Sequence, residues 1–190
     1  MGKKYIKYPA VFLDRDGTLI YDKNYLSSPD QVKLYSYAAA SINKLKKAGF
    51  KVIVVTNQSG VAKGMFTLED LNKIHKKFLS LLKKAGTTVD GIYFCPHLDE
   101  DKCECRKPKT GMAVQGAKDF NIDLKKSYVV GDSIRDYSLG YNIGGKGVLV
   151  LTGHGKKQQK EISHEMMQPF AICRDLKQAV NLIIKDAEKC

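Results

Sequence analysis

The chain has 190 residues, of which 43% are hydrophobic, and it carries 32 basic and 20 acidic side chains for a formal net charge of +12. This length and composition suit a globular fold with a buried core and exclude disordered, collagen-like and disulfide-rich chains. No run approaches the roughly 18 apolar residues that a membrane span needs. The first residues also lack the apolar core of a secretory signal. We therefore expect a cytoplasmic protein whose five cysteines are reduced.

The positive charge is spread along the chain. Residues 1–60, 61–110 and 111–190 have net charges of +6, +3 and +3, and no block of five or six like charges occurs. Many lysines fall on the outer faces of expected helices, which is typical of a solvated surface. This interpretation argues against nucleic acid as a partner, and the lack of a membrane span argues against a membrane.

Short apolar runs alternate with helical patterns, which predicts βα units around a mainly parallel sheet. In chain order we expect a strand at 10–13, a helix at 38–48, a strand at 52–55, a helix that begins after Thr67, strands at 91–94, 128–130, 148–151 and 170–173, and a helix at 175–187. The helix after Thr67 has a capping-box pattern and an apolar stripe (Leu71, Ile74, Phe78 and Leu81). The pattern predicts one open α/β domain over residues 1–190, with helices on both faces of the sheet.

Two carboxylates follow the first expected strand. Asp14 and Asp16 stand in the run DRDGTL, and Gly17 allows the backbone to bend so that both side chains converge. A carboxylate can attack phosphorus while a second carboxylate moves the proton, and Mg²⁺ would be held by such oxygens. A simple polar turn would give the same pattern without any catalytic role.

Two further polar clusters follow expected strands. Thr56, Asn57, Gln58 and Ser59 offer hydroxyl, amide and backbone N–H groups that could bind phosphate oxygens. The run Gly131-Asp132-Ser133 offers Asp132 as a further metal ligand, whereas Asp136 could as easily lie on the exposed face of a helix. Ligands of open α/β sheets bind at the carboxyl ends of the strands, where all three clusters are expected.

Three cysteines and a histidine stand close together in the segment 95–105. Cys95 and His97 are followed, after five residues, by Cys103 and Cys105. Three thiolates and one imidazole form the closed four-ligand set that structural Zn²⁺ prefers, and the metal would order a loop that is too short to form a core. The alternatives are four unconnected residues or a disulfide. Catalytic zinc is disfavoured because no ligand position is left open.

Taken together, DRDGTL, TNQSG, RKP and GDS occur in an order that resembles the haloacid dehalogenase (HAD) superfamily of phosphohydrolases. The resemblance implies a Rossmann-like sheet and assigns the nucleophile to Asp14 and the general acid/base to Asp16. It assigns phosphate binding to Thr56, charge neutralisation to Lys107 and magnesium binding to Asp132, with Asp14 and Asp16 as the other expected ligands.

The run CPH…CECRKPKTGM further resembles the zinc-containing branch of this superfamily, whose members act on D,D-heptose 1,7-bisphosphate or on histidinol phosphate and lack a large cap domain. This resemblance implies that Arg106 faces a second phosphate or a sugar oxygen. Asp22 and Tyr25 stand where the branch has a substrate-binding loop. With Arg15, Asn57, Gln58 and Ser59, these residues form the expected substrate-binding set.

The resemblance favours a magnesium-dependent, monomeric phosphatase that removes the 7-phosphate of a heptose bisphosphate, on the way to nucleotide-activated heptose. TNQSGVAKGMFT supports the heptose branch, whereas the short zinc loop is equally similar to the histidinol-phosphate branch. Ser133 departs from the basic residue expected in heptose enzymes. A histidinol-phosphate or other small phosphomonoester phosphatase, a nucleic-acid 3′-phosphatase and a non-enzymatic zinc module that binds nucleic acid are the alternatives.

The remaining histidines and cysteines have no assigned chemistry. His75 is expected to be structural, and Cys173 to pack in a strand. His154 and His164 have no assigned role, and Cys190 is a terminal thiol.

Overall fold

A six-stranded parallel sheet organises the computed structural model, which describes residues 7–162 and 167–189. The strands are β1 (Ala10–Leu13), β2 (Lys51–Asn57), β3 (Gly91–Cys95), β4 (Tyr128–Gly131), β5 (Lys146–Val150) and β6 (Ala171–Cys173). The predicted open α/β sheet is confirmed, and each predicted strand is present with its ends moved by at most two residues. His164 and Cys190 lie outside the described residues.

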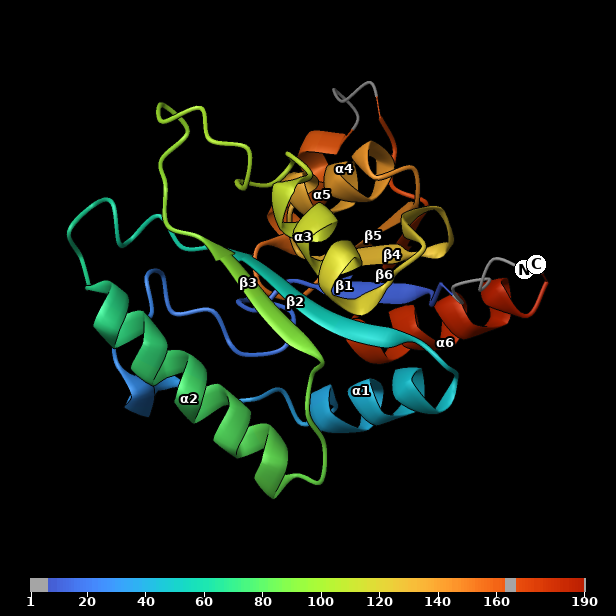
Figure 1. Cartoon of the computed structure of the whole chain (residues 1–190), viewed down its shortest axis with the longest axis horizontal. Helices are drawn as coiled ribbons and strands as arrows, with labels where there is room; N and C mark the ends of the chain where they lie inside the picture. The colour runs from blue at the N-terminus through green and yellow to red at the C-terminus, as the bar shows by residue number, and fades with distance from the viewer. Residues whose placement is uncertain (1–6, 163–166, 190) are drawn as a thin grey trace, which may run out of the picture.

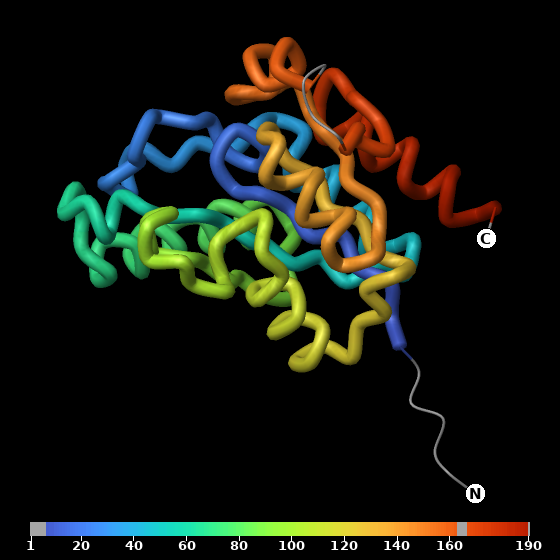
Figure 2. The backbone as a smooth tube through the Cα atoms, turned by 90° about the horizontal axis from the view of Figure 1, so that it is seen from above, coloured from blue at the N-terminus to red at the C-terminus, as the bar shows by residue number. Residues whose placement is uncertain are grey.

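The strand order β3-β2-β1-β4-β5-β6 places β1 near the middle of the sheet (Figure 1). The first half of the chain extends from β1 toward one edge and the second half toward the other, as the blue-to-green and orange-to-red parts of the tube show (Figure 2). The direction of winding reverses between β1 and β4. Open α/β sheets place their ligand crevice outside the carboxyl ends of the strands at this point.

Helices cover both faces of the sheet (Figure 1). One face carries α1 (Ala38–Lys47), α2 (Leu68–Lys84) and α6 (Leu176–Ala187), and the other carries α3 (Gly111–Phe120), α4 (Ile134–Asn142) and α5 (Gly155–Glu161). Short 3₁₀ helices occupy Pro29–Gln31 and Leu124–Lys126. In the described part of the chain, no helix is long and apolar enough to cross a membrane.

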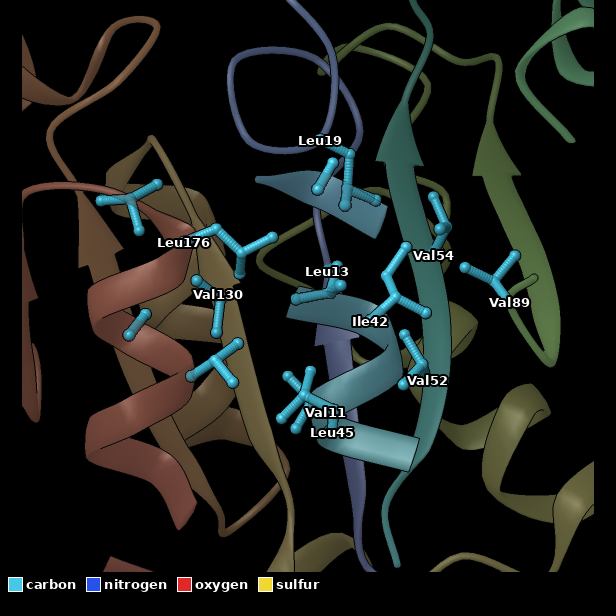
Figure 3. Packing of buried hydrophobic residues seen from close by; sticks show 14 of the residues in the cluster. Val11, Leu13, Leu19, Ile42, Leu45, Val52, Val54, Val89, Val130 and Leu176 are labelled. Carbon is cyan, nitrogen blue, oxygen red and sulfur yellow. The ribbon is translucent and has the colours of Figure 1, made fainter. Parts of the chain in front are cut away.

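The buried strands divide their side chains between the two helical layers, because successive side chains point to opposite faces. Phe12 of β1 packs with Met112 of α3 and Leu139 of α4. Its neighbours in β1 point to the opposite face, where the packing is closed by α1 and α6. Figure 3 shows that layer, which includes Val11, Leu13, Ile42, Leu45, Val52, Val54, Val130 and Leu176.

The helix α2 begins at the predicted cap. The Thr67 hydroxyl accepts a hydrogen bond from the Asp70 N–H, and the Asp70 carboxylate accepts from the Thr67 N–H. The stripe predicted for this helix is confirmed at its first three positions, whereas Leu82 is fully buried in place of Leu81. A one-residue drift of this kind follows from the 3.6-residue repeat of a helix.

His75 is packed into the inner face of α2 and belongs to the fold, as predicted. Its side chain is 8% exposed, and its ring lies 5.5 Å from that of Phe94. Burial, with a smaller contribution from the charge of Arg15, lowers the pKa of His75 to about 4. Protonating this imidazole in the folded protein is therefore unfavourable.

We expect His75 to make the protein less stable in acid. An unfolded histidine has a pKa of about 6.5, so the folded state is penalised progressively as the pH falls from 6.5 to 4, by up to about 3 kcal/mol. Urea unfolding between pH 4 and 7.5 should show that His75→Leu removes this part of the pH dependence. Phe78→Leu alters the same buried face without a titrating group and should keep it. A wild-type slope in His75→Leu would contradict the assignment.

Candidate active site and thiolate cluster

A polar pocket of about 640 Å³ opens at the carboxyl end of the sheet, beside the switch point between β1 and β4. Its volume lies in the range of small-molecule sites. All twelve residues that the sequence analysis placed in the catalytic, substrate-binding and magnesium-binding sets line this pocket. They come from segments far apart in the chain, which meet because parallel strands end at the same edge of the sheet.

At the base of the pocket, a buried ammonium group bridges two carboxylates. Lys107 Nζ donates to Asp14 Oδ1 at 2.6 Å, to Asp136 Oδ1 at 2.6 Å and to the carbonyl oxygen of Val55 at 2.8 Å. The Lys107 side chain is only 3% exposed. All three of its N–H donors are thus used, which fixes the direction of the Asp14 carboxylate just beyond β1.

The electrostatic balance of this cluster depends on Lys107. Burial opposes the lysine charge, but the carboxylates of Asp136 and Asp14 outweigh burial and hold the pKa of Lys107 above its usual value. Burial raises the pKa of Asp14 well above its usual value; Lys107 opposes that rise, and the carboxylates of Asp136, Asp132 and Asp16 add to it. Positive charge added beside Asp14 would stabilise its ionised form.

Asp136 belongs to this cluster, contrary to the expectation that it could as easily lie on an exposed helix face. It is 1% exposed, and its second oxygen accepts hydrogen bonds from the N–H and the hydroxyl of Ser133. These contacts form a capping box at the start of α4, and they hold the Asp136 side chain inside the protein. The Ser-x-x-Asp spacing is the sequence signal that would have identified this cap.

The Asp16 carboxylate is held by three neighbours. Arg15 donates from Nε to Oδ2 at 3.0 Å and from a terminal nitrogen to Oδ1 at 3.1 Å, and Gln58 donates from Nε2 to Oδ2 at 2.8 Å. The Thr56 hydroxyl lies 3.5 Å from the same oxygen. The Arg15 side chain is only 1% exposed. Its main role is therefore to orient the Asp16 carboxylate.

Asp132 follows β4 and faces the turn that carries Gly17. Its Oδ2 accepts a hydrogen bond from the backbone N–H of His154 at 2.7 Å. A Cβ atom added at Gly17 or at Gly153 would lie 2.1 or 2.0 Å from this oxygen, and both glycines have positive φ. The two backbones can approach Asp132 this closely only because neither residue has a side chain.

The free oxygens of this cluster suit a hard divalent cation. Burial raises the pKa of Asp132 to about 7, and the charge of Asp136 contributes to the shift. Oδ2 of Asp14 and Oδ1 of Asp132 accept no hydrogen bond from the residues that the structure describes. Carboxylates with raised pKa values and unshared oxygens have the donor chemistry that Mg²⁺ prefers.

The loop after β1 forms one side of the pocket mouth. Asp22 Oδ2 lies 2.7 Å from His154 Nε2, and Tyr25 accepts a hydrogen bond from Lys63 Nζ. His154, to which no role was assigned from the sequence, thus joins this loop to the loop that holds Asp132. Its contact through a backbone N–H has no signature in sequence, because every non-proline residue carries that group.

Asn57 and Ser59, which follow β2, also line the pocket. Asn57 makes two hydrogen bonds to the backbone of Lys107: its Oδ1 accepts from the Lys107 N–H at 3.0 Å, and its Nδ2 donates to the Lys107 carbonyl at 3.2 Å. The amide side chain therefore fixes the backbone that delivers the buried ammonium group.

The thiolate cluster lies directly before Lys107 in the chain. Sγ of Cys95, Nδ1 of His97, Sγ of Cys103 and Sγ of Cys105 all lie within 4.8 Å of one another, with neighbouring contacts of 3.3 to 3.6 Å. A tetrahedral site with Zn–S bonds of about 2.3 Å would have edges of roughly 3.7 Å. In the part of the chain that the structure describes, these four residues form the one group of three or more His, Cys, Asp or Glu ligand atoms that lie this close together. The carboxylate oxygens of the pocket are therefore spread more widely.

The chemistry of the four donors fits zinc. The cysteines are free, with no disulfide among the described residues. Although burial acts in the opposite direction, hydrogen bonds from the Cys105 thiol and the Arg106 N–H bring the pKa of Cys103 to about 7. Burial raises the pKa of Cys95 and of Cys105. A metal would stabilise all three thiolates, which deprotonate on binding.

Arg106 connects this cluster with the pocket. It donates from Nε to Asp99 Oδ1 at 2.7 Å and from Nη1 to the carbonyl oxygen of His97 at 3.0 Å, while its side chain lines the pocket. Arg106 is therefore positioned by the same loop that carries the thiolates.

An aspartate pair after the first strand, a buried lysine and a late aspartate on a parallel α/β sheet define a HAD-type phosphatase. Residues 10–184 match the family model described as polynucleotide kinase 3 phosphatase. The chain belongs to this family of HAD phosphatases, within the group that contains the heptose-1,7-bisphosphate 7-phosphatases.

Three relatives show how far the similarity extends. The chain is 40% identical over 157 residues to D-glycero-beta-D-manno-heptose-1,7-bisphosphate 7-phosphatase of Neisseria meningitidis, with 82% of this chain and 84% of that protein covered. It is 40% identical over 141 residues to the histidine biosynthesis bifunctional protein HisB of Blochmanniella floridana, with 73% of this chain but 40% of that protein covered. The crystal structure of D,D-heptose 1,7-bisphosphate phosphatase from B. bronchiseptica, complexed with magnesium and phosphate, has a TM-score of 0.84 and 34% identity, covering 94% of this chain and 99% of that one.

We expect Cys103→Ser to lose zinc and to loosen the loop of residues 95–105 while the sheet stays folded. One of four ligands is removed, and the loop has little core of its own. Metal analysis should find about one zinc per wild-type chain and much less in the variant, and limited proteolysis should show faster cleavage at Lys102. Cys173→Ser, in β6 and outside the cluster, should keep its zinc. Full zinc content in Cys103→Ser would contradict the ligand assignment.

Proposed function

We propose that this chain is a Mg²⁺-dependent phosphatase that removes the 7-phosphate of D-glycero-D-manno-heptose 1,7-bisphosphate. The contact of buried Lys107 with Asp14 supports the reaction most directly, because it leaves one Asp14 oxygen without a partner at the base of a polar pocket. The substrate is supported by relatives named as heptose bisphosphate phosphatases, with which the similarity covers most of both chains.

In the first step, Asp14 Oδ2 attacks phosphorus. A bond forms between that oxygen and phosphorus as the bond from phosphorus to the sugar oxygen breaks, and Asp16 donates its proton to the departing oxygen. In the second step, Asp16 takes a proton from a water molecule that attacks the aspartyl-phosphate. Inorganic phosphate leaves, and both Asp14 and the protonated Asp16 are regenerated.

The surrounding side chains stabilise negative charge on the phosphate and orient the reacting carboxylate. Gln58 and Arg15 orient the Asp16 carboxylate through hydrogen bonds. The Thr56 hydroxyl and the Lys107 ammonium stabilise negative charge on the equatorial phosphate oxygens. Because Lys107 is already fixed by Asp136 and Val55, little reorganisation is needed during the reaction.

Asp132 would hold Mg²⁺ through its unshared Oδ1, and Asp14 through the carboxylate oxygen that does not attack phosphorus. Asp16, the third ligand suggested by the sequence, has both carboxylate oxygens engaged by Arg15. When bound, the cation supplies positive charge that neutralises the phosphate and lowers the pKa of Asp14. Zinc would be structural, bound by Cys95, His97, Cys103 and Cys105. We also propose a cytoplasmic monomer formed by a single domain that acts on a free phosphorylated sugar.

Two other phosphatase activities have specific support. The HisB relative and the short thiolate loop support a histidinol-phosphate substrate. The description of the family model supports a 3′-phosphorylated polynucleotide. The pocket volume of about 640 Å³ favours a small molecule over a polynucleotide, and the coverage of the heptose relatives favours the sugar.

Replacing the nucleophile should abolish turnover and preserve the fold. Asp14→Asn keeps the side-chain volume and an acceptor oxygen for Lys107, but an amide cannot form the aspartyl-phosphate. We expect at least about a thousandfold loss in kcat with an unchanged far-ultraviolet circular dichroism spectrum. Asp119→Asn, on the outer face of α3, should behave as wild type. Near-normal turnover by Asp14→Asn would refute the mechanism.

Phosphate release from three substrates tests the specificity. With Mg²⁺ present, we expect kcat/KM for the heptose bisphosphate to exceed that for histidinol phosphate and for a 3′-phosphorylated oligonucleotide. Phosphorus NMR of the product should show that the 1-phosphate is retained. A higher kcat/KM for either alternative substrate, or a product that keeps its 7-phosphate, would overturn the proposed function.

A further inference from the structure

Two arginines meet on one carboxylate at the outer wall of the pocket. Asp99 Oδ1 accepts from Nε of Arg106 at 2.7 Å, and Asp99 Oδ2 accepts from Nη2 of Arg135 at 2.9 Å. Asp99 belongs to the thiolate loop, whereas Arg135 lies on the first turn of α4. Both arginines line the pocket, so this bridge joins the thiolate loop to α4 beside the pocket.

These arginines are the pocket's remaining strong cations. Arg15 is buried against Asp16, and all three donors of Lys107 are engaged in the cluster with Asp14. Arg106 is 12% exposed, and Arg135 is 45% exposed. A second anionic group on a substrate held at Asp14 would therefore meet guanidinium groups at this wall.

Most of the N–H donors of Arg135 are not engaged by the residues that the structure describes. A guanidinium group carries five N–H donors in a planar fork, and among the described residues Arg135 uses one nitrogen, on Asp99. Arg106 uses three nitrogens, on Asp99 and the His97 carbonyl. The bridge leaves the Arg135 fork able to bind phosphate oxygens, and the positive end of the α4 dipole lies beside it.

The side chain of Ser133, two residues before Arg135, is engaged by Asp136. Its hydroxyl donates to Asp136 Oδ2 at 2.6 Å and its N–H donates to the same oxygen at 3.0 Å. This side chain positions the carboxylate that holds Lys107, and it offers no positive charge. The resemblance to heptose enzymes leads one to expect a basic residue at position 133. In this chain the positive charge is instead carried by Arg135, on the first turn of the same helix.

We propose that Arg135 determines specificity by binding the second phosphate of the bisphosphate substrate, together with Arg106. In the free enzyme, Asp99 binds both guanidinium groups and keeps them together beside the pocket. The inference rests on the proposed function, because only a doubly phosphorylated substrate can reach Asp14 and this wall together.

The test compares the heptose 1,7-bisphosphate with the heptose 7-phosphate, which lacks the second phosphate. Arg135→Gln should lower kcat/KM for the bisphosphate by about tenfold to a hundredfold, the effect of losing a charged hydrogen bond, chiefly through KM. Its kcat/KM for the monophosphate should stay within about twofold of wild type, because no contact to that substrate is removed. Arg174→Gln, an exposed arginine that pairs with Asp175, is the matched control and should change neither value.

Asp99→Asn distinguishes phosphate binding from a structural role. It weakens the bridge but keeps both guanidinium groups, so the preference for the bisphosphate should fall by no more than about fivefold, as expected for an exposed ion pair. If Asp99→Asn loses as much preference as Arg135→Gln, or if Arg135→Gln keeps the wild-type preference, the inference is overturned. A wild-type enzyme without preference for the bisphosphate would instead overturn the proposed function.

Discussion

The buried ammonium group of Lys107 is the contact on which the rest of the site depends. It lies between Asp14 and Asp136, at 2.6 Å from each, with the Val55 carbonyl as its third acceptor. Removing two carboxylates and an ammonium group from water is costly, and only close hydrogen bonding offsets that cost. The cluster ties the ends of β1 and β2 to the first turn of α4, so the geometry of Asp14, the proposed nucleophile, and the packing of the sheet edge are set together.

The thiolate loop is coupled to that contact through the backbone. Lys107 comes two residues after Cys105, and Asn57 binds both its N–H and its carbonyl oxygen. A metal at the thiolates restrains the chain on one side of Lys107, while Asn57 at the end of β2 restrains Lys107 itself. Loss of order in the loop therefore affects the charge balance at Asp14, although no thiolate lines the pocket.

Local patterns predicted much of this architecture, and tertiary contacts explain what they missed. The β-branched run before Thr56 and the aspartates after Leu13 indicate buried strands with polar ends, and the Cys/His spacing indicates a ligand set. The helix α3 was not predicted, since glycines stand at residues 111 and 116 and weaken its helical propensity. Gly116 is explained only by packing, because a Cβ there would lie 3.2 Å from Tyr93. The inward turn of Asp136 likewise depends on Lys107, 29 residues away.

The net charge of the pocket differs from the net charge of the whole molecule. Five aspartates line the pocket (Asp14, Asp16, Asp22, Asp132 and Asp136) against four basic side chains (Arg15, Arg106, Lys107 and Arg135). Most of these charges are already paired with one another, so the surplus of +12 lies elsewhere and acts on a substrate only through the screened field of the whole surface. A pocket so nearly balanced has little attraction for a free phosphate dianion. A divalent cation at Asp14 and Asp132 would reverse the sign, which couples phosphate binding to metal binding within a single site.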